Sequence, residues 1–133
     1  MLHIVPVQDK SRQAQLAQLF SVDYSDRAFA YLALDEDADG NANALIGFLQ
    51  FTVGDGFAEV ISLTQQEGSD DEEALQIMAR AAFSFIDRIG VPEVRIPKTV
   101  CSEKLMKLLR MEDRGDFWSL DVAKYYGTRC GDR

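Results

Sequence analysis

The chain has 133 residues, a length that fits one domain, and 47% of them are apolar, which is ordinary for a soluble globular protein. Its net charge of −8 argues against nucleic acids and anionic membranes as partners, because both are polyanions. Cys101 and Cys130 have no CxxC spacing, so we expect reduced thiols in a cytoplasmic protein. No apolar run approaches the ~18 residues of a membrane span. The single histidine, His3, leaves too few ligands for a zinc site.

The N-terminal part of the chain predicts a strand, a helix and a second strand. Residues 2–7 are rich in β-branched residues, and Pro6 favours a sheet edge because proline cannot donate to a strand ladder. Asp9 or Ser11 is expected to cap a helix that ends near residue 21. The expected buried face of this helix carries Leu16, Leu19 and Phe20. A polar loop then leads into a strand over residues 28–34.

The acidic segment 35–43 predicts a hairpin loop, because an apolar strand over residues 44–53 follows it. Its oxygen-bearing residues recur at alternate positions, as they do at the start of a calcium loop: Asp35, Asp37, Asp39, Asn41 and Asn43. The twelfth position of a calcium loop needs a bidentate glutamate, and that position here is Ile46. We therefore expect a solvated turn that binds calcium weakly, if at all.

A turn at residues 54–56 precedes a strand over 57–64, a helix over about 70–89 and a strand over 94–96. Apolar residues at steps of three and four indicate that this helix buries one broad face. The residues expected on that face are Leu75, Met78, Ala82, Phe85 or Ile86, and Ile89. Ser69 and Glu72 have the spacing of a capping box, and Gly90 suits the turn after the last helical residue. Strands on both sides of one helix predict a parallel βαβ unit.

The rest of the chain predicts a short helix over 98–112, a turn over 113–116 and a final strand over 117–122. The apolar side of the short helix consists of Leu105, Leu108, Leu109 and Met111. The sequence from Lys124 onward is polar and resembles a frayed end. We expect one domain over residues 1–126 and a polar tail over 127–133. The fold class is α/β (α+β), with a mixed sheet of about six to seven strands.

This order of elements resembles the GNAT superfamily, the GCN5-related N-acetyltransferases, over nearly the whole chain. The segment Leu45-Ile46-Gly47-Phe48 is similar to the family's third strand, which has two hydrophobic residues, a glycine and an aromatic residue. The resemblance implies a GNAT fold and transfer of an acyl group from acyl-coenzyme A to an amine. The alternative is a non-catalytic domain of this fold that binds a protein or a small ligand and has lost coenzyme A.

The family's cofactor loop has Gln or Arg, two residues, Gly, one residue, and Gly or Ala before the central helix. Backbone N–H groups of such a loop hold a pyrophosphate at a helix N-terminus. The resemblance implies cofactor contacts for Gln65, Gly68 and Ser69, whereas Asp70 replaces the last small residue. A register aligned on the helix does not restore the motif. Four successive carboxylates at 70–73 repel a pyrophosphate, so we expect acetyl-coenzyme A to bind weakly or not at all.

The family's catalytic residues are matched only in part. A glutamate in its fourth strand often acts as general base, and Glu59 lies on the corresponding strand; the alternative role of Glu59 is a solvent-facing strand residue. The family's tyrosine, which protonates the leaving thiolate, has no counterpart in residues 99–113, where Met106 and Leu109 are nearest its position. The substrate stays open, and so does the choice between a monomer and a homodimer.

Overall fold

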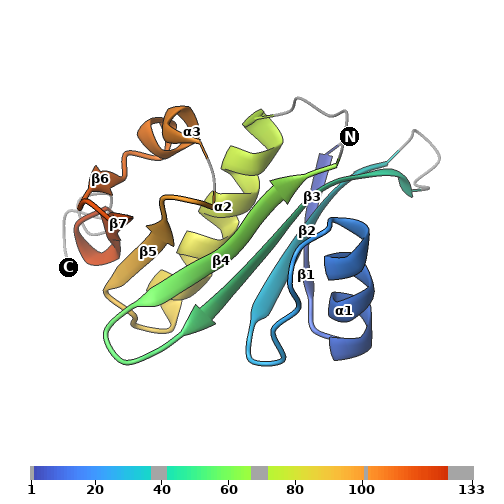
Figure 1. Ribbon diagram of the computed structural model, residues 1–133, viewed down its shortest axis with the longest axis horizontal. Coiled ribbons are helices and arrows are strands. Elements are labelled where there is room, and N and C mark those ends of the chain that lie inside the picture. Colours follow the sequence, from blue (N-terminus) through green and yellow to red (C-terminus); the bar gives the residue numbers. More distant parts are fainter. Residues whose placement is uncertain (1, 37–41, 67–71, 101, 126–133) are drawn as a thin grey trace.

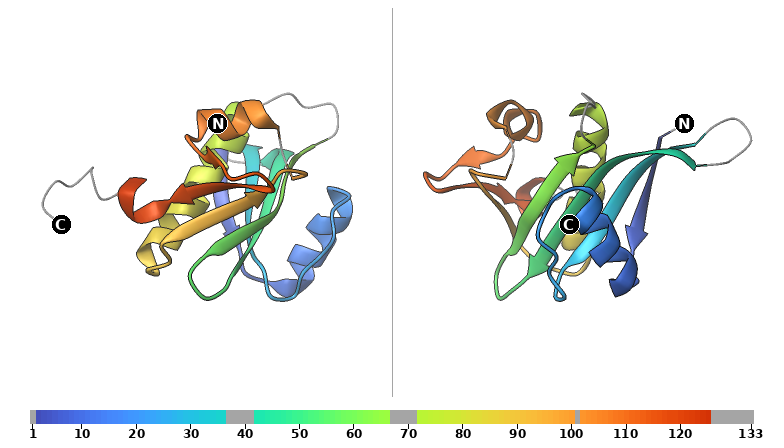
Figure 2. Two further views of the ribbon diagram at one scale, coloured as in Figure 1. Left: turned by 60° about the vertical axis from the view of Figure 1, so that its left-hand side comes forward. Right: turned by 45° about the vertical axis from the view of Figure 1, so that its right-hand side comes forward.

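The computed structural model describes residues 2–36, 42–66, 72–100 and 102–125. Within them, seven strands form one mixed sheet in the order β1-β2-β3-β4-β5-β7-β6. The strands are β1 (Leu2–Val7), β2 (Phe29–Glu36), β3 (Ala42–Val53), β4 (Ala58–Gln65), β5 (Glu93–Pro97), β6 (Glu112–Asp113) and β7 (Phe117–Asp121). The helices are α1 (Lys10–Leu19), α2 (Glu72–Arg88) and α3 (Glu103–Leu108). Helix α1 covers one face of the sheet, and α2 and α3 lie on the other (Figures 1 and 2).

Two apolar clusters hold these layers together. The larger one packs α2 and α3 onto β3, β4, β5 and β7, and the smaller one packs α1 onto β1, β2 and β3. Alternation along β2 and β3 assigns successive side chains to the two clusters. In β3, Leu49 and Phe51 face α2, whereas Phe48 faces α1. The mixed sheet with a central βαβ unit is therefore confirmed, and β1 is an edge strand as its proline predicts.

Helix α2 has the predicted buried face, with one correction at its end. Leu75, Met78 and Ala82 are buried as predicted. Of the two alternatives Phe85 and Ile86, Ile86 is the one that is fully buried. Ile89 is 46% exposed, so its predicted burial is wrong. The helix ends at Arg88, and Gly90 adopts a φ of 83° immediately afterwards. The chain therefore reverses before Ile89 can turn toward the sheet.

Helix α1 begins where predicted but buries a different face. Asp9 is its N-cap, since the Asp9 carboxylate accepts a hydrogen bond from the Ser11 N–H at 2.9 Å. The buried stripe contains Gln13, Leu16, Ala17 and Phe20. Leu19 is 58% exposed, and the prediction that it is buried is wrong. At ~100° per residue, Leu19 lies roughly a quarter-turn or more from the centre of that stripe.

Gly47 lets α2 lie close to β3. A Cβ atom at this position would come within 3.1 Å of the Leu75 Cδ2 atom, 3.2 Å of the Met78 Cε atom and 3.3 Å of the Thr64 carbonyl oxygen. The apolar-apolar-Gly-aromatic segment therefore has a packing role here. It brings the first turns of α2 against the middle of the sheet.

The C-terminal part differs most from prediction. Helix α3 spans six residues instead of the expected 98–112, because Ser102 is its N-cap and Arg110 adopts a φ of 61° just after its end. Leu108 is consequently 43% exposed, which corrects its predicted burial, whereas Leu105, Leu109 and Met111 are buried. A short strand, β6, was not expected. Residues 122–125 form a helical turn rather than the frayed end that their polarity suggested.

Several sequence-based expectations fall on residues outside the described ranges. They concern the tip of the acidic hairpin between β2 and β3, the Ser69 cap, and both cysteines. None of the helices in the described ranges is long and apolar enough to cross a membrane.

Candidate functional site

The parallel strands β4 and β5 separate soon after they meet. Their ladder contains only Ala58 opposite Val94 and Glu59 opposite Arg95. Beyond Glu59, β4 stays paired with β3 on its other side, while β5 stays paired with β7. The edge of β4 from Val60 to Thr64 has no strand partner on the β5 side among the described residues. We call this gap the β4–β5 opening; Figure 1 shows the two strands diverging toward α3.

A β-bulge lies at the start of the β4–β5 opening. Gln50 of β3 pairs with Ser62, whereas the next residue, Phe51, pairs with Val60, so Ile61 is an extra residue in β4. A bulge bends its strand and increases the local twist. The bend turns β4 away from β5, which explains why the ladder ends at Glu59.

Glu59 lies at the apex of the β4–β5 opening, as the last β4 residue paired with β5. Its neighbours Ala58 and Val60 are buried in the cluster under α2. Alternation therefore directs the Glu59 side chain to the opposite face of the sheet, where it is half-buried. This position leaves the carboxylate accessible from the face that α1 only partly covers.

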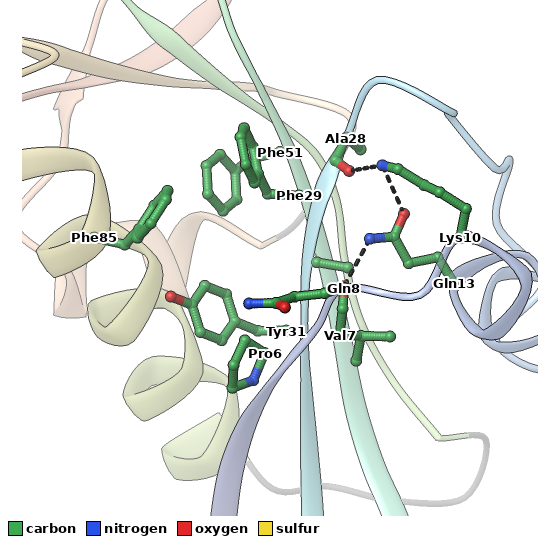
Figure 3. A pocket seen from close by; sticks show the side chains of 11 residues that line it. Pro6, Val7, Gln8, Lys10, Gln13, Ala28, Phe29, Tyr31, Phe51 and Phe85 are labelled. Atoms are coloured by element: carbon green, nitrogen blue, oxygen red, sulfur yellow. Dashed lines mark hydrogen bonds between the residues drawn. The ribbon is translucent and has the colours of Figure 1, made fainter. Parts of the chain in front are cut away.

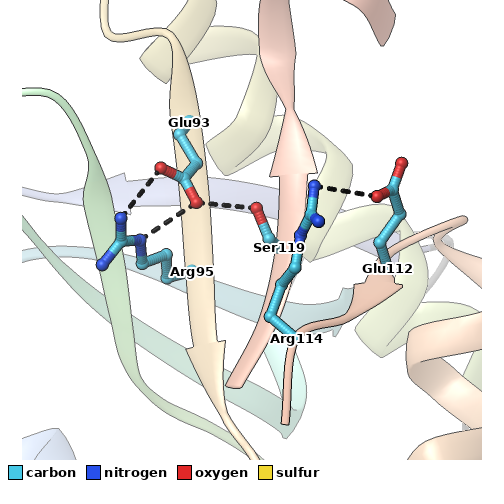
Figure 4. Close-up of polar contacts among 5 residues, drawn as sticks. All are labelled: Glu93, Arg95, Glu112, Arg114 and Ser119. Carbon is cyan, nitrogen blue, oxygen red and sulfur yellow. Dashed lines mark hydrogen bonds and ion pairs between the residues drawn. The ribbon is translucent and has the colours of Figure 1, made fainter. Parts of the chain in front are cut away.

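Arg95 organises the face beside Glu59 (Figure 4). Its Nε and Nη2 atoms donate to the two carboxylate oxygens of Glu93 at 3.0 and 3.2 Å. Its guanidinium also lies 4.0 Å from the ring centre of Phe57 and 4.7 Å from that of Phe117. A cation held between two rings and a bidentate carboxylate is fixed in one orientation.

Glu93 accepts a further hydrogen bond from the Ser119 hydroxyl at 2.7 Å. The hydrogen bonds from Arg95, and in part that from Ser119, hold the pKa of Glu93 below its ordinary value, although partial burial acts in the other direction. Nearby, Arg114 pairs with Glu112 at 3.0 Å. The carboxylates of Glu93 and Glu112 are thus each matched by an arginine.

The side-chain amide of Gln50 is buried next to the bulge. The Gln50 Nε2 atom donates to the Asp23 carbonyl oxygen at 2.8 Å and to the Ser62 hydroxyl oxygen at 3.1 Å. Gln50 is fully buried, and its Oε1 atom has no hydrogen-bond partner among the described residues. This contact fixes the Ser62 side chain next to the bulged residue.

The expected cofactor residues are only partly described. Gln65 is the last residue of β4 and pairs with Gly47, so it is a strand residue and not the first loop residue that the motif implied. Gly68 and Ser69 lie outside the described residues. In the first turn of α2, the Glu72 carboxylate is 3.3 Å from the Lys104 ammonium of α3, whereas Glu73 is exposed. Of the two described carboxylates at this end of α2, that of Glu72 is therefore matched by a cation.

Helix α3 offers no proton donor at the position where the resemblance implied a tyrosine. Met106 and Leu109, the residues nearest that position, are both buried in the core. Their side chains serve packing, and neither can transfer a proton.

Sequence analysis missed Arg95, Glu93, Ser119 and the Gln50–Ser62 contact. The signal for the first two is the alternation of charged and apolar residues in β5, where Val94 and Ile96 are buried and Glu93 and Arg95 face the other side. Gln50 stands out as a polar residue between two buried apolar ones, Leu49 and Phe51. Arg95 and Glu93 are two residues apart on one strand, whereas the Ser119–Glu93 and Gln50–Ser62 contacts join different strands, so no local pattern could identify those two.

Comparison with solved structures places this architecture in one fold class. The chain matches mutant forms of the spermidine/spermine N-acetyltransferase SpeG from Vibrio cholerae with a TM-score of 0.68 and 12% identity over 96% of this chain and 99% of that chain. It matches the ribosomal-protein-S18-alanine N-acetyltransferase from Escherichia coli with a TM-score of 0.66 and 8% identity over 92% of this chain and 94% of that one. A GNAT family acetyltransferase from Brucella melitensis in complex with acetyl-CoA gives a TM-score of 0.63 and 12% identity over 91% of this chain and 88% of that chain.

The chain therefore has the GNAT fold, and the resemblance in element order is confirmed at the level of fold. No family model matches the sequence. No curated protein matches it either. Identities of about a tenth make this chain a divergent example of the fold.

Proposed function

We propose that the protein binds an acyl-coenzyme A in the β4–β5 opening and transfers the acyl group to an amine. The observation that carries the proposal is the separation of β4 and β5 beyond Glu59, beside the bulge at Ile61. A strand edge in the middle of a sheet presents backbone N–H and C=O groups that need partners. The pantetheine arm of coenzyme A contains amide groups of the kind that can supply them. A protein of the same fold has been solved in complex with acetyl-CoA.

The charges near the start of α2 favour weak binding of this cofactor. A pyrophosphate is attracted by the helix dipole but repelled by carboxylates at the same end. The ion pair between Glu72 and Lys104 offsets one of these charges, and the exposed Glu73 carboxylate can turn into water. We therefore propose a dissociation constant well above the micromolar range, with Lys104 as the residue that keeps binding measurable.

Glu59 is the proposed general base. The cofactor, when bound, supplies a thioester whose carbonyl carbon an amine can attack. Glu59 accepts the proton that the substrate ammonium must lose, directly or through a water molecule, from the apex of the β4–β5 opening. Because α3 carries no tyrosine, we assign the proton for the leaving sulfur to solvent.

Calorimetric titration with acetyl-coenzyme A, followed by a thiol-release assay on a panel of amines, tests this function. We expect weak binding and slow turnover, and a Glu59→Gln variant with kcat lowered at least ~100-fold, within the range of general base catalysis, and unchanged cofactor affinity. Glu112→Gln, an exposed carboxylate elsewhere on the same sheet, is the matched control. No detectable binding at millimolar cofactor, or full activity of Glu59→Gln, would overturn the proposal.

The role of Lys104 is tested separately. Lys104→Met leaves the Glu72 carboxylate unmatched, so we expect weaker cofactor binding, whereas Lys107→Met, on the same helix and paired with Glu103, should change it little. Asp70→Gly combined with Glu72→Gly should strengthen binding if the helix keeps its first turn. Equal effects of the two lysine variants would show that the cofactor does not approach this end of α2.

A second candidate function has an observation of its own. Buried methionine and leucine residues replace a proton donor in α3, and carboxylates crowd the start of α2. Both features suit a non-catalytic domain of this fold that binds a protein or a small ligand. This alternative predicts folded protein that neither binds acetyl-coenzyme A nor releases its thiol with any amine tested.

A further inference from the structure

An aromatic hollow lies at the far end of α2 from the β4–β5 opening. It has a volume of ≈ 260 Å³, and its apolar walls include Phe29, Phe51 and Phe85 (Figure 3). The ring centres are 5.3 Å apart for Phe29 and Phe51, and 5.5 Å apart for Phe29 and Phe85. Phe29 is 45% exposed, so this cluster is open to a ligand instead of being sealed in the core.

A polar end adjoins this aromatic end. A neighbouring hollow of ≈ 360 Å³ shares Gln8, Tyr31 and Phe85 with the first and adds Arg88. Tyr31 and Arg88 both line this second hollow. Burial raises the pKa of the Tyr31 hydroxyl, and the positive charge of Arg88 offsets part of that effect. The described residues form no hydrogen bond with the Tyr31 hydroxyl, and in Figure 3 the Gln8 amide points toward its ring.

The charges around the two hollows are all of one sign. The chain has 22 acidic and 14 basic residues, yet among the described residues no aspartate or glutamate lines either hollow, whereas Lys10 and Arg88 do. The Lys10 ammonium donates to the Ala28 carbonyl oxygen at 2.6 Å and to the Gln13 side chain at 3.2 Å. Within the described part of the chain, neither cation is paired with a carboxylate. The site therefore combines an apolar floor with a positive rim.

We propose that this combined hollow binds a small aryl-alkyl carboxylate, with its ring on Phe29, Phe51 and Phe85 and its carboxylate at Tyr31 and Arg88. The chemistry of the two ends carries the assignment. Aromatic walls favour a flat apolar group, and a hydroxyl donor beside the Arg88 guanidinium favours an anion. A cavity of about 150 Å³ accommodates benzene, so the aromatic hollow has room for a ring with a short side chain.

This site is separate from the proposed acyl-transfer centre. The hollow involves the last turns of α2, whereas the β4–β5 opening lies toward its first turns. Phe51 of the hollow pairs with Val60, next to Glu59, but Phe51 and Phe85 belong to the cluster under α2. The Glu59 side chain points to the opposite face of the sheet. Ligand binding at one site can be measured without occupying the other.

The probe for the test is 3-phenylpropionate, with 3-phenylpropan-1-ol as its neutral counterpart. In amide NMR titrations of the whole chain we expect shifts centred on Phe29, Tyr31 and Phe85, with a dissociation constant on the order of 1 mM for a ligand of this size. The alcohol should bind about fivefold more weakly, because it lacks the charge that Arg88 attracts.

Variants separate the two ends of the site. Arg88→Met should weaken binding of the acid about fivefold and leave the alcohol unchanged, and Arg114→Met, at the other edge of the sheet, is its matched control. Phe85→Leu should weaken binding of both probes. Arg88 is exposed, so its variant tests the proposal even if Phe85→Leu fails to fold. Equal affinity for acid and alcohol, an equal effect of the two arginine variants, or no shifts at about ten times the expected dissociation constant would overturn it.

Discussion

The absence of a side chain at Gly47 sets how closely α2 approaches the sheet. Two of the three atoms that a Cβ would meet are the ends of the flexible side chains Leu75 and Met78, and the third is the backbone oxygen of Thr64. The side chains can move by a few tenths of an ångström, but the strand cannot move as easily. The cost of filling this position therefore falls on the packing of α2.

We expect Gly47→Ala to lower the free energy of unfolding by about 1–3 kcal/mol, the range for overpacking a filled core. Urea unfolding followed by circular dichroism measures it. Gly54→Ala is the control, since its Cβ would meet only the Phe57 carbonyl oxygen at 3.8 Å, an ordinary contact. If both variants lost the same stability, close approach at Gly47 would not be the cause.

A second prediction for a single residue concerns Glu93 and the dependence of folding stability on pH. Its folded pKa lies below the ordinary value of 4.5, mainly because of the hydrogen bonds from Arg95. A depressed carboxylate pKa contributes stability that is present above the unfolded value and is lost as the pH falls through the folded pKa. Glu93→Gln should lower stability by about 1 kcal/mol at pH 7 and reduce the loss of stability on acidification below 4.5.

Thermal unfolding midpoints from pH 7 to pH 3 measure this effect. Glu112→Gln removes an exposed carboxylate that pairs with Arg114, and it should change the profile little because exposed ion pairs contribute little. A Glu93→Gln variant with the profile of the unmutated protein would show that the Arg95 contact has no net effect on stability.

At the scale of elements, α2 contributes most to the larger core. Its buried residues include Met78, Phe83 and Ile86, all of them fully inaccessible. Near its end, Phe85 lies on the wall of the aromatic hollow, and Ile89, just after the last helical residue, is exposed. The same helix therefore combines a structural role in its middle with a surface role at its end.

We expect Met78→Ala to cost roughly 2–4 kcal/mol of folding stability, from lost burial plus a cavity. Ile89→Ala should cost less than about 1 kcal/mol, because nearly half of that side chain is already exposed. Chemical unfolding of both variants under one set of conditions makes the comparison. Similar losses at the two positions would mean that the end of α2 is more deeply buried in solution than its exposure indicates.

At the scale of the whole molecule, electrostatics sets the affinity for an anionic cofactor. The chain has a net charge of −8, and Glu72 and Glu73 add to the potential at the start of α2. Salt screens repulsion between solvent-exposed charges, with a Debye length of about 10 Å at 0.1 M. Added salt weakens this repulsion and so raises the affinity for the cofactor. If the cofactor were instead held by opposite charges, added salt would weaken that attraction and lower the affinity.

We expect acetyl-coenzyme A to bind more tightly, by about two- to fivefold, as salt rises from about 20 to 200 mM. Calorimetric titration at the two concentrations measures this change, and the neutral fragment pantetheine is the control, with no salt dependence expected. Affinity that falls with salt would place the cofactor against a basic surface and contradict the proposed approach at the start of α2.

Local patterns in the sequence determined the order of elements apart from β6, the parallel unit around α2 and most of its buried face. Periodicity, caps such as Asp9 and the turn at Gly90 are properties of neighbouring residues, so they can be recognised without coordinates. The acidic start of α2 and the lack of a tyrosine in residues 99–113 are likewise evident from the chain itself. Together they indicated the fold and the weakness of its cofactor motif.

Only the tertiary structure decided where those faces end and which distant residues meet. Ile89, Leu19 and Leu108 are apolar but exposed. Ile89 follows the end of α2, Leu19 lies off the buried stripe of α1, and Leu108 is the last residue of a helix shorter than predicted. The hydrogen bond from the Ser119 hydroxyl to Glu93 requires the register between β5 and β7. The aromatic hollow joins residues from β1, β2, β3 and α2, which are far apart in sequence. Strand register and helix placement are long-range properties, and no local pattern of residue types contains them.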